Sequence, residues 1–136
     1  VICLEANTIG WGASGRNNGQ VIAGLKLDPD KVMKVLGQTQ GSRLVKLSGQ
    51  APDLVFSLIK QHNIKCDAQR NGWIQPASNH AIKEITARMQ QWQNLGAPVK
   101  LLDPETLANT LGTDWYQGAF LIAGVAVSIH WLIPVD

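Results

Sequence analysis

The chain opens with VICLEANTIGWGASGRNNGQ (residues 1–20), where a short apolar run ends in an acid and a glycine-rich loop follows. The run from Val1 to Leu4 predicts a β-strand, and Glu5 stands at its carboxyl end. In dinucleotide-binding folds, the acid that ends the second strand hydrogen-bonds the ribose hydroxyls, and a phosphate-binding glycine turn lies about 20 residues upstream. This order predicts a nucleotide site whose first glycine turn would precede Val1.

The loop and several later stretches resemble one family of flavoproteins. Leu4-Glu5-Ala6 followed by Gly10-Trp-Gly-Ala-Ser-Gly-Arg-Asn-Asn-Gly-Gln20 is similar to the FAD-dependent D-amino-acid oxidase and glycine oxidase family. Within that family, the gamma-glutamylputrescine oxidoreductase group has the pattern Gly-x-Gly-Ala-Ser-Gly-Arg-Asn-Gly-Gly-Gln, from which Asn18 departs. The resemblance extends from Val1 to about Phe120, and its later matches are Arg43–Ser48, Ile64–Asp67, Gly72–Gln75, Leu95–Gly96 and Tyr116–Gly118.

The resemblance implies an FAD site in the first 20 residues. It implies that Glu5 accepts hydrogen bonds from the adenosine ribose, and that the loop wraps the pyrophosphate and ribitol. Glycines permit positive φ and close approach to an anion, while Arg16 adds a fixed positive fork. Asn18 tolerates the left-handed region but places side-chain atoms where the family has bare backbone. The implied cofactor-binding residues are Glu5, Gly10, Gly12, Ser14, Gly15, Arg16, Asn17, Gly19 and Gln20.

The residues alone also permit a simpler interpretation, in which Glu5 is a solvated acid and the loop is a connector. We nominate no catalytic residue, because flavin amine oxidases take most of their chemistry from the cofactor. We also expect no metal site. The three histidines have no partner at metal-ligand spacing, and the two cysteines, Cys3 and Cys66, form no C-x-x-C pair. Two unpaired cysteines fit a reducing, cytoplasmic setting.

Composition limits the class of protein. A chain of 136 residues with 45% hydrophobic residues suits a single domain over residues 1–136. The net charge of +2 is too small to favour a nucleic-acid partner. The uncharged run from Phe120 to Val135 is shorter than the roughly 20 apolar residues that a membrane-spanning helix needs, so we expect no membrane span.

Caps and periodicity divide the rest of the chain. Two Asp-Pro pairs predict helix starts, and glycines predict helix ends. Pro52 removes a helical hydrogen bond to the Ser48 carbonyl and predicts a kink or break near Ser48-Gly49. The sequence Asn71-Gly72 predicts a hairpin turn between two short strands. The expected helices cover residues 28–37, 42–62, 79–95 and 103–112, and the expected strands cover 64–69, 72–77, 99–102 and 116–120.

This order predicts an α+β fold with three to four helices and a largely antiparallel or mixed sheet. By resemblance, residues 1–27 are a remnant of the FAD-binding strand and loop, and include the second strand of the dinucleotide-binding domain. Residues 28–120 are similar to the family's substrate domain. Residues 121–136 form a tail that does not resemble the family.

The tail alternates apolar and small or polar residues, which predicts a strand. With codons chosen freely, a two-nucleotide offset from Leu121 encodes a string that resembles the family's continuation. We therefore expect a family gene that is cut at its start and frameshifted near Leu121.

Two function hypotheses follow from these features. The first is a truncated FAD-dependent amine or amino-acid oxidoreductase, which acts on a small amine when complete. Alone it would hold no FAD tightly and would lack oxidase activity. The second is a stand-alone binding or self-associating protein that retained the folded core. Unpaired strand edges are templates for pairing, so we expect a homo-oligomer joined through the terminal strands.

Overall fold

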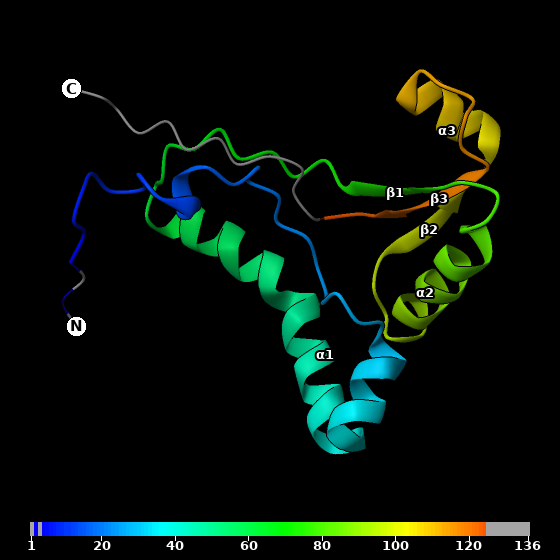
Figure 1. Cartoon of the computed structure of the whole chain (residues 1–136), viewed down its shortest axis with the longest axis horizontal. Coiled ribbons are helices and arrows are strands. Elements are labelled where there is room, and N and C mark those ends of the chain that lie inside the picture. The colour runs from blue at the N-terminus through cyan, green and yellow to red at the C-terminus, as the bar shows by residue number, and fades with distance from the viewer. Residues whose placement is uncertain (1, 3, 125–136) are drawn as a thin grey trace.

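The computed structural model describes residue 2 and residues 4–124 of the 136-residue chain. Three α-helices and three strands confirm the predicted α+β class (Figure 1). Of the run predicted as the first strand, the described residues Ile2 and Leu4 belong to no strand, and residues 125–136 of the tail lie outside the described part. The elements are η1 (Ala13–Gly15), α1 (Pro29–Gln61), β1 (Trp73–Ala77), α2 (Ile82–Asn94), β2 (Val99–Leu102), α3 (Pro104–Leu111) and β3 (Gly118–Ile122).

The sheet has the order β1–β3–β2, and both pairings are antiparallel. The central strand, β3, carries the apolar run that is buried on both sides, and its Ile122 pairs with Trp73 of β1 and Val99 of β2. The predicted hairpin between residues 64–69 and 72–77 is therefore wrong. Gly72 has φ +94°, and a Cβ there would lie 3.0 Å from the Ile122 carbonyl oxygen. This glycine permits close approach to β3 instead of forming a two-residue turn.

Helix α1 consists of two arms that meet at Gly37, where the backbone is non-helical at φ +75° and ψ 160°. The predicted helix end at this glycine is confirmed. Figure 1 shows the two arms at a sharp angle, with the second and longer arm running beneath the N-terminal segment. Their close approach depends on Gly41, because a Cβ at this position would lie 2.5 Å from the Cα of Met33. A small residue therefore permits the turn between the arms.

Pro52 does not break α1, and this part of the prediction is wrong. The only non-helical position inside α1 is Gly37. Proline still leaves the Ser48 carbonyl without its helical donor, but the N–H of Gly24 donates to that carbonyl at 3.1 Å. The segment before α1 therefore satisfies this acceptor and is held against the second arm.

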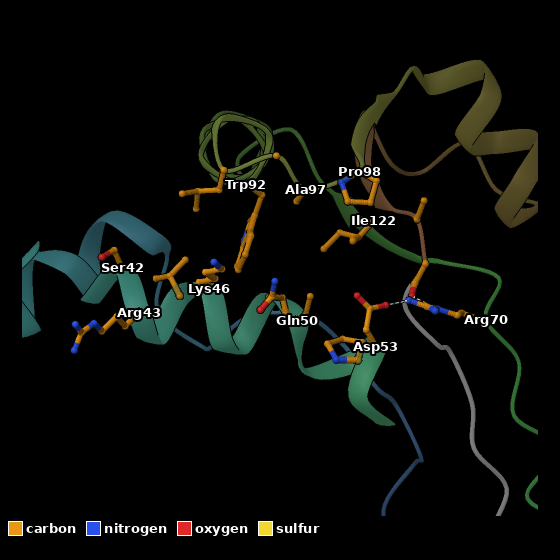
Figure 2. A pocket seen from close by; sticks show the side chains of 18 residues that line it. Ser42, Arg43, Lys46, Gln50, Asp53, Arg70, Trp92, Ala97, Pro98 and Ile122 are labelled. Atoms are coloured by element: carbon orange, nitrogen blue, oxygen red, sulfur yellow. Dashed lines mark hydrogen bonds and ion pairs between the residues drawn. The ribbon is translucent and has the colours of Figure 1, made fainter. Parts of the chain in front are cut away.

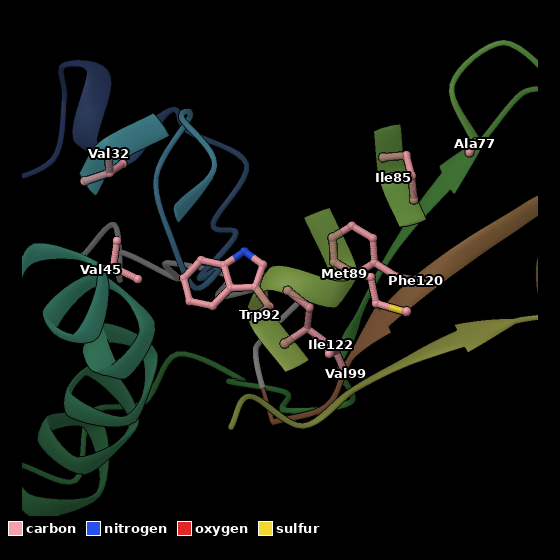
Figure 3. Close-up of a cluster of buried hydrophobic side chains, with 9 residues drawn as sticks. All are labelled: Val32, Val45, Ala77, Ile85, Met89, Trp92, Val99, Phe120 and Ile122. Carbon is pink, nitrogen blue, oxygen red and sulfur yellow. The ribbon is translucent and has the colours of Figure 1, made fainter. Parts of the chain in front are cut away.

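Helix α2 joins the sheet to α1 through one apolar stripe. Ile85 and Met89 face the sheet, and Trp92, which is 8% exposed, extends from α2 toward Val45 of α1 (Figure 3). Phe120 of β3 lies in the same cluster, with its ring 5.9 Å from that of Trp73 in an edge-to-face arrangement. This core cluster therefore combines side chains from α1, α2 and all three strands of the sheet.

Helix α3 follows its predicted caps closely. The Asp103 carboxylate accepts a hydrogen bond from the Thr106 N–H at 2.9 Å, and Gly112 ends the helix in the left-handed region. Leu107 is fully buried in a second cluster with Leu102 and Ala119. Among the described residues, no helix is both long and apolar enough to cross a membrane.

Candidate functional site

Two glycines of the glycine-rich loop use the conformational freedom that only glycine has. Gly10 and Gly19 have φ values of +78° and +66°, in the region that glycine adopts without strain. The Glu5 carboxylate accepts a hydrogen bond from the Asn7 N–H at 2.9 Å, and Asn17 Oδ1 accepts one from the Gly19 N–H at 2.7 Å. These local bonds use part of the donor and acceptor capacity that the FAD interpretation assigns to the loop.

The loop also has the Gly-x-Gly-x-x-Gly spacing at Gly10, Gly12 and Gly15. In a dinucleotide site this spacing opens an α-helix whose N-terminus faces the pyrophosphate. Here it opens η1, a 3-10 helix of three residues that includes Ser14 in its backbone. Gly15 packs against the Gly10 carbonyl, where no Cβ would fit. The glycines therefore support a compact turn, and the helix that would complete a phosphate site does not follow.

Several polar side chains of the loop are open to solvent. Arg16 lies over the ring of Trp11, with its guanidinium carbon 4.7 Å from the ring centroid, as in a cation–π contact. Glu5, Asn17 and Gln20 are exposed, and Gly19 is buried. A carboxylate suits the ribose hydroxyls of FAD, and a guanidinium and left-handed glycines suit its pyrophosphate. They line neither of the two described pockets, so these residues alone do not enclose a cofactor.

The larger of these pockets lies elsewhere, between the second arm of α1 and the turn that joins α2 to β2. It has a volume of about 620 Å³ (Figure 2). Val45, Trp92, Pro98 and Ile122 form apolar parts of its wall. No motif marks this pocket in the sequence, because its residues come from segments between Ala23 and Gly124 that meet only in the folded chain.

Charged side chains border the pocket on the α1 side. Arg70 forms an ion pair with Asp53, donates to the Gly124 carbonyl and lies over the Phe56 ring at 4.8 Å. These contacts hold the end of β3 against α1. Lys46, in contrast, makes no hydrogen bond or ion pair with any residue that the structure describes.

A second polar cluster has a structural role. Asp28 is 6% exposed and accepts hydrogen bonds from Lys31 Nζ at 2.8 Å and Arg88 Nε at 2.5 Å. Burial raises the pKa of the Asp28 carboxyl, but the bonds from Lys31 and Arg88 outweigh it and hold that pKa below its ordinary value. Arg88 also donates to Gln75 Oε1 at 3.3 Å, so the cluster links the start of α1 to α2 and β1.

The described histidines form no constellation with other metal-binding side chains. No group of three or more potential metal ligands occurs in the described part of the chain. His80 lines a smaller pocket of about 410 Å³ with Asp114 and Trp115, whereas His62 is exposed at the end of α1. His130 lies outside the described residues.

Comparison with models of known protein families assigns the chain to one of them. The DAO family, described as FAD dependent oxidoreductase, matches residues 1–130. The chain belongs to this family of FAD-dependent oxidoreductases. The match to the family extends past Phe120, where we expected the likeness to end.

Two curated relatives agree with this assignment. The chain is 29% identical over 122 residues to gamma-glutamylputrescine oxidoreductase of Escherichia coli (strain K12), covering 89% of this chain and 29% of the relative. It is 31% identical over 121 residues to the probable oxidoreductase OrdL of Haemophilus influenzae, covering 87% of this chain and 28% of the relative. The chain therefore spans about three tenths of the curated relatives that it matches.

The fold has a counterpart among solved structures. Glycine oxidase from Geobacillus kaustophilus superposes with a TM-score of 0.67 at 20% identity. The superposition covers 93% of this chain and 33% of the glycine oxidase chain. The fold of this chain is thus similar to that of one segment of the glycine oxidase chain.

Proposed function

We propose that this chain is the FAD-loop and substrate-domain segment of an oxidoreductase that acts on a small amine. Two observations support this proposal: the family match over residues 1–130 and the left-handed glycines of the loop. Glu5 would accept hydrogen bonds from the ribose hydroxyls, and Arg16 would face the pyrophosphate. Bound FAD would supply the redox chemistry, while the protein supplies binding and orientation.

We further propose that the 136-residue chain does not hold FAD tightly or oxidise amines on its own. The loop offers two or three polar contacts, each contributing about 1 kcal/mol, or up to about 3 kcal/mol where one group is charged. The entropy of association opposes this sum. The result is an affinity on the millimolar scale, since 1 mM corresponds to about −4 kcal/mol.

The experiment is a titration of the purified chain with FAD, followed by amide NMR shifts. We expect weak binding whose shifts concentrate at residues 10–20, a colourless protein after gel filtration, and no amine-dependent peroxide. Arg16→Gln should weaken binding further, whereas Lys100→Gln, a matched change at an exposed position of β2, should not. Stoichiometric flavin after gel filtration would refute the proposed weak affinity. Shifts confined to another surface would refute the assignment of the loop.

A second candidate function is self-association. Three large apolar side chains near the N-terminus are open to solvent: Ile2 is 88% exposed, Leu4 is 94% exposed and Ile9 is 83% exposed. Exposed apolar side chains close together in the sequence favour contact with an apolar partner surface. We propose that a second copy of the chain covers these side chains, which retains the predicted homo-oligomer joined through its terminal segments.

Light scattering over a range of concentrations tests this candidate. We expect the mass to rise toward that of a dimer or larger oligomer. Leu4→Ser should shift the equilibrium toward monomer, while Val35→Ser, a similar change at a 71% exposed position on the first arm of α1, should not. A monomer at every concentration would exclude self-association. Equal effects of both substitutions would exclude the N-terminal surface.

A further inference from the structure

We propose that the pocket between α1 and α2 is a binding site for a small amphipathic carboxylate, meaning an apolar ring or chain that carries one anionic group. This site is separate from the FAD loop, because none of the nine implied cofactor-binding residues lines it. Four features of the pocket support this ligand class: its size, its apolar wall, the charges at its border and the packing that holds it open.

The size and wall of the pocket suit a small organic ligand. Its volume of about 620 Å³ lies in the range of about 300–1,000 Å³ that is common for ligand sites. Figure 2 shows Trp92, Ala97, Pro98 and Ile122 along the side that faces α1. These side chains come from α2, the α2–β2 turn and β3. They offer dispersion contacts and an aromatic edge, but none of them offers a charge that would attract a cation.

The charges favour an anion. Of the described residues that line the pocket, Asp53 is the one acid, and its ion pair with Arg70 already balances its charge. Lys46 and Gln50 lie on the α1 wall, toward Trp92 in Figure 2, and neither has a polar partner among the described residues. Arg43 lines the outer border and adds a second positive charge that no described residue pairs. A carboxylate at this wall would therefore find a cation and an amide donor with free capacity.

The pocket is pre-formed because its aromatic wall is confined. A Cβ at Gly24 would lie 2.6 Å from Trp92 Cζ2, and one at Gly49 would lie 3.2 Å from Trp92 Cζ3. The six-membered ring of the indole thus packs closely against two glycines, one before α1 and one inside it. At the other end, Arg70 joins Asp53 to the Gly124 carbonyl. Binding a ligand would cost little further ordering of these groups, which favours binding.

Three matched probes test the site on the complete chain: naphthalene-2-carboxylate, its neutral amide and the cationic naphthalen-2-ylmethylamine. We expect saturable binding of the carboxylate, with NMR shifts at the Trp92 indole and at the Gly49 and Ala97 amides. The amide should bind several-fold more weakly, and the amine more weakly still. Lys46→Gln should weaken carboxylate binding about five- to tenfold, the effect of losing one charge-assisted hydrogen bond, while leaving amide binding unchanged.

Lys60→Gln is the control, because Lys60 lies on the same helix but does not line the pocket. It should change binding of none of the probes, and circular dichroism should show equal helix content in both variants. Absence of saturable shifts at Trp92 would overturn the site. Equal binding of all three probes, or an unchanged carboxylate affinity in Lys46→Gln, would overturn the assignment to an anion. Failure of this test leaves the FAD titration unaffected, because the two experiments follow different residues.

Discussion

Replacing Gly24 with alanine would disturb the contact that joins the N-terminal segment, α1 and α2. Gly24 has φ +96°, and a methyl group there would lie 2.6 Å from Trp92 Cζ2 and 3.2 Å from Trp92 Cη2. Trp92 cannot move away easily, because its ring also lies close to Gly49, where an added Cβ would be 3.2 Å from Trp92 Cζ3. The N–H of Gly24 holds the Ser48 carbonyl that Pro52 leaves without a donor. We therefore expect Gly24→Ala to destabilise the fold.

The expected loss has two parts. A non-glycine residue at this positive φ costs about 1–2 kcal/mol. Overpacking against a confined ring costs about 1–3 kcal/mol. We expect the free energy of unfolding to fall by about 2–5 kcal/mol, a large fraction of the stability of a small domain.

Urea denaturation followed by circular dichroism measures this loss, and two other glycines separate its parts. Gly96 has φ +82° with nothing within 4 Å of a Cβ, so Gly96→Ala should show the backbone part alone, about 1–2 kcal/mol. Gly49 is helical and its Cβ would lie 3.2 Å from Trp92. In Gly49→Ala the tight contact is offset by a gain of up to about 1 kcal/mol in helix propensity, so its effect should be small.

A double-mutant cycle tests the contact directly. Trp92→Phe removes the atoms that the new methyl group would meet, so Gly24→Ala should cost about 1–3 kcal/mol less when it is combined with Trp92→Phe than when it is made alone. Additive effects of the two substitutions would refute the contact between Gly24 and Trp92. A loss in Gly24→Ala no larger than that in Gly96→Ala would refute the overpacking term.

Two further changes test other parts of the fold. The pKa of the Asp28 carboxyl in the folded chain lies below its ordinary value of 3.8, so the ionised carboxylate stabilises the fold above that pH, and this stabilisation is lost as the pH falls through the folded pKa. Asp28→Asn should lower the free energy of unfolding by about 1.5–3 kcal/mol at pH 7 and make its loss at acid pH shallower, as measured by urea melts at several pH values. An unchanged acid transition would exclude the Asp28 ion pairs as the cause of that transition. Asp103→Ala removes the bond to the Thr106 N–H and should cost about 1 kcal/mol by thermal melting, and no loss would show that the cap is unimportant.

Local chemistry was sufficient to predict several element boundaries. Strand β2 has the predicted bounds, and α3 lies between the predicted Asp103 cap and Gly112 stop. Asn63 has φ +49° just after α1, in the left-handed region that asparagine tolerates. These features depend on groups within a few residues of one another, so the sequence contains the physical cause of each. The implied FAD residues share this property, because they lie within one short stretch.

Local sequence patterns did not predict the contacts between segments that are distant in the chain. The Asn71-Gly72 signal predicted a hairpin, but β1 pairs with β3, whose burial between two strands outweighs a local turn. Pro52 predicted a broken helix, but the Gly24 N–H satisfies the carbonyl that proline leaves open.

The family, the fold class, the caps of α3 and the left-handed glycines can be predicted from the sequence, because each depends on neighbouring residues or on a motif. Four other features become visible only in the folded chain: the strand order, the continuity of α1 through Pro52, the confinement of Trp92 and the pocket beside Lys46. Each of these requires side chains or backbone groups from remote segments to meet, and their packing free energy exists only after the chain has folded.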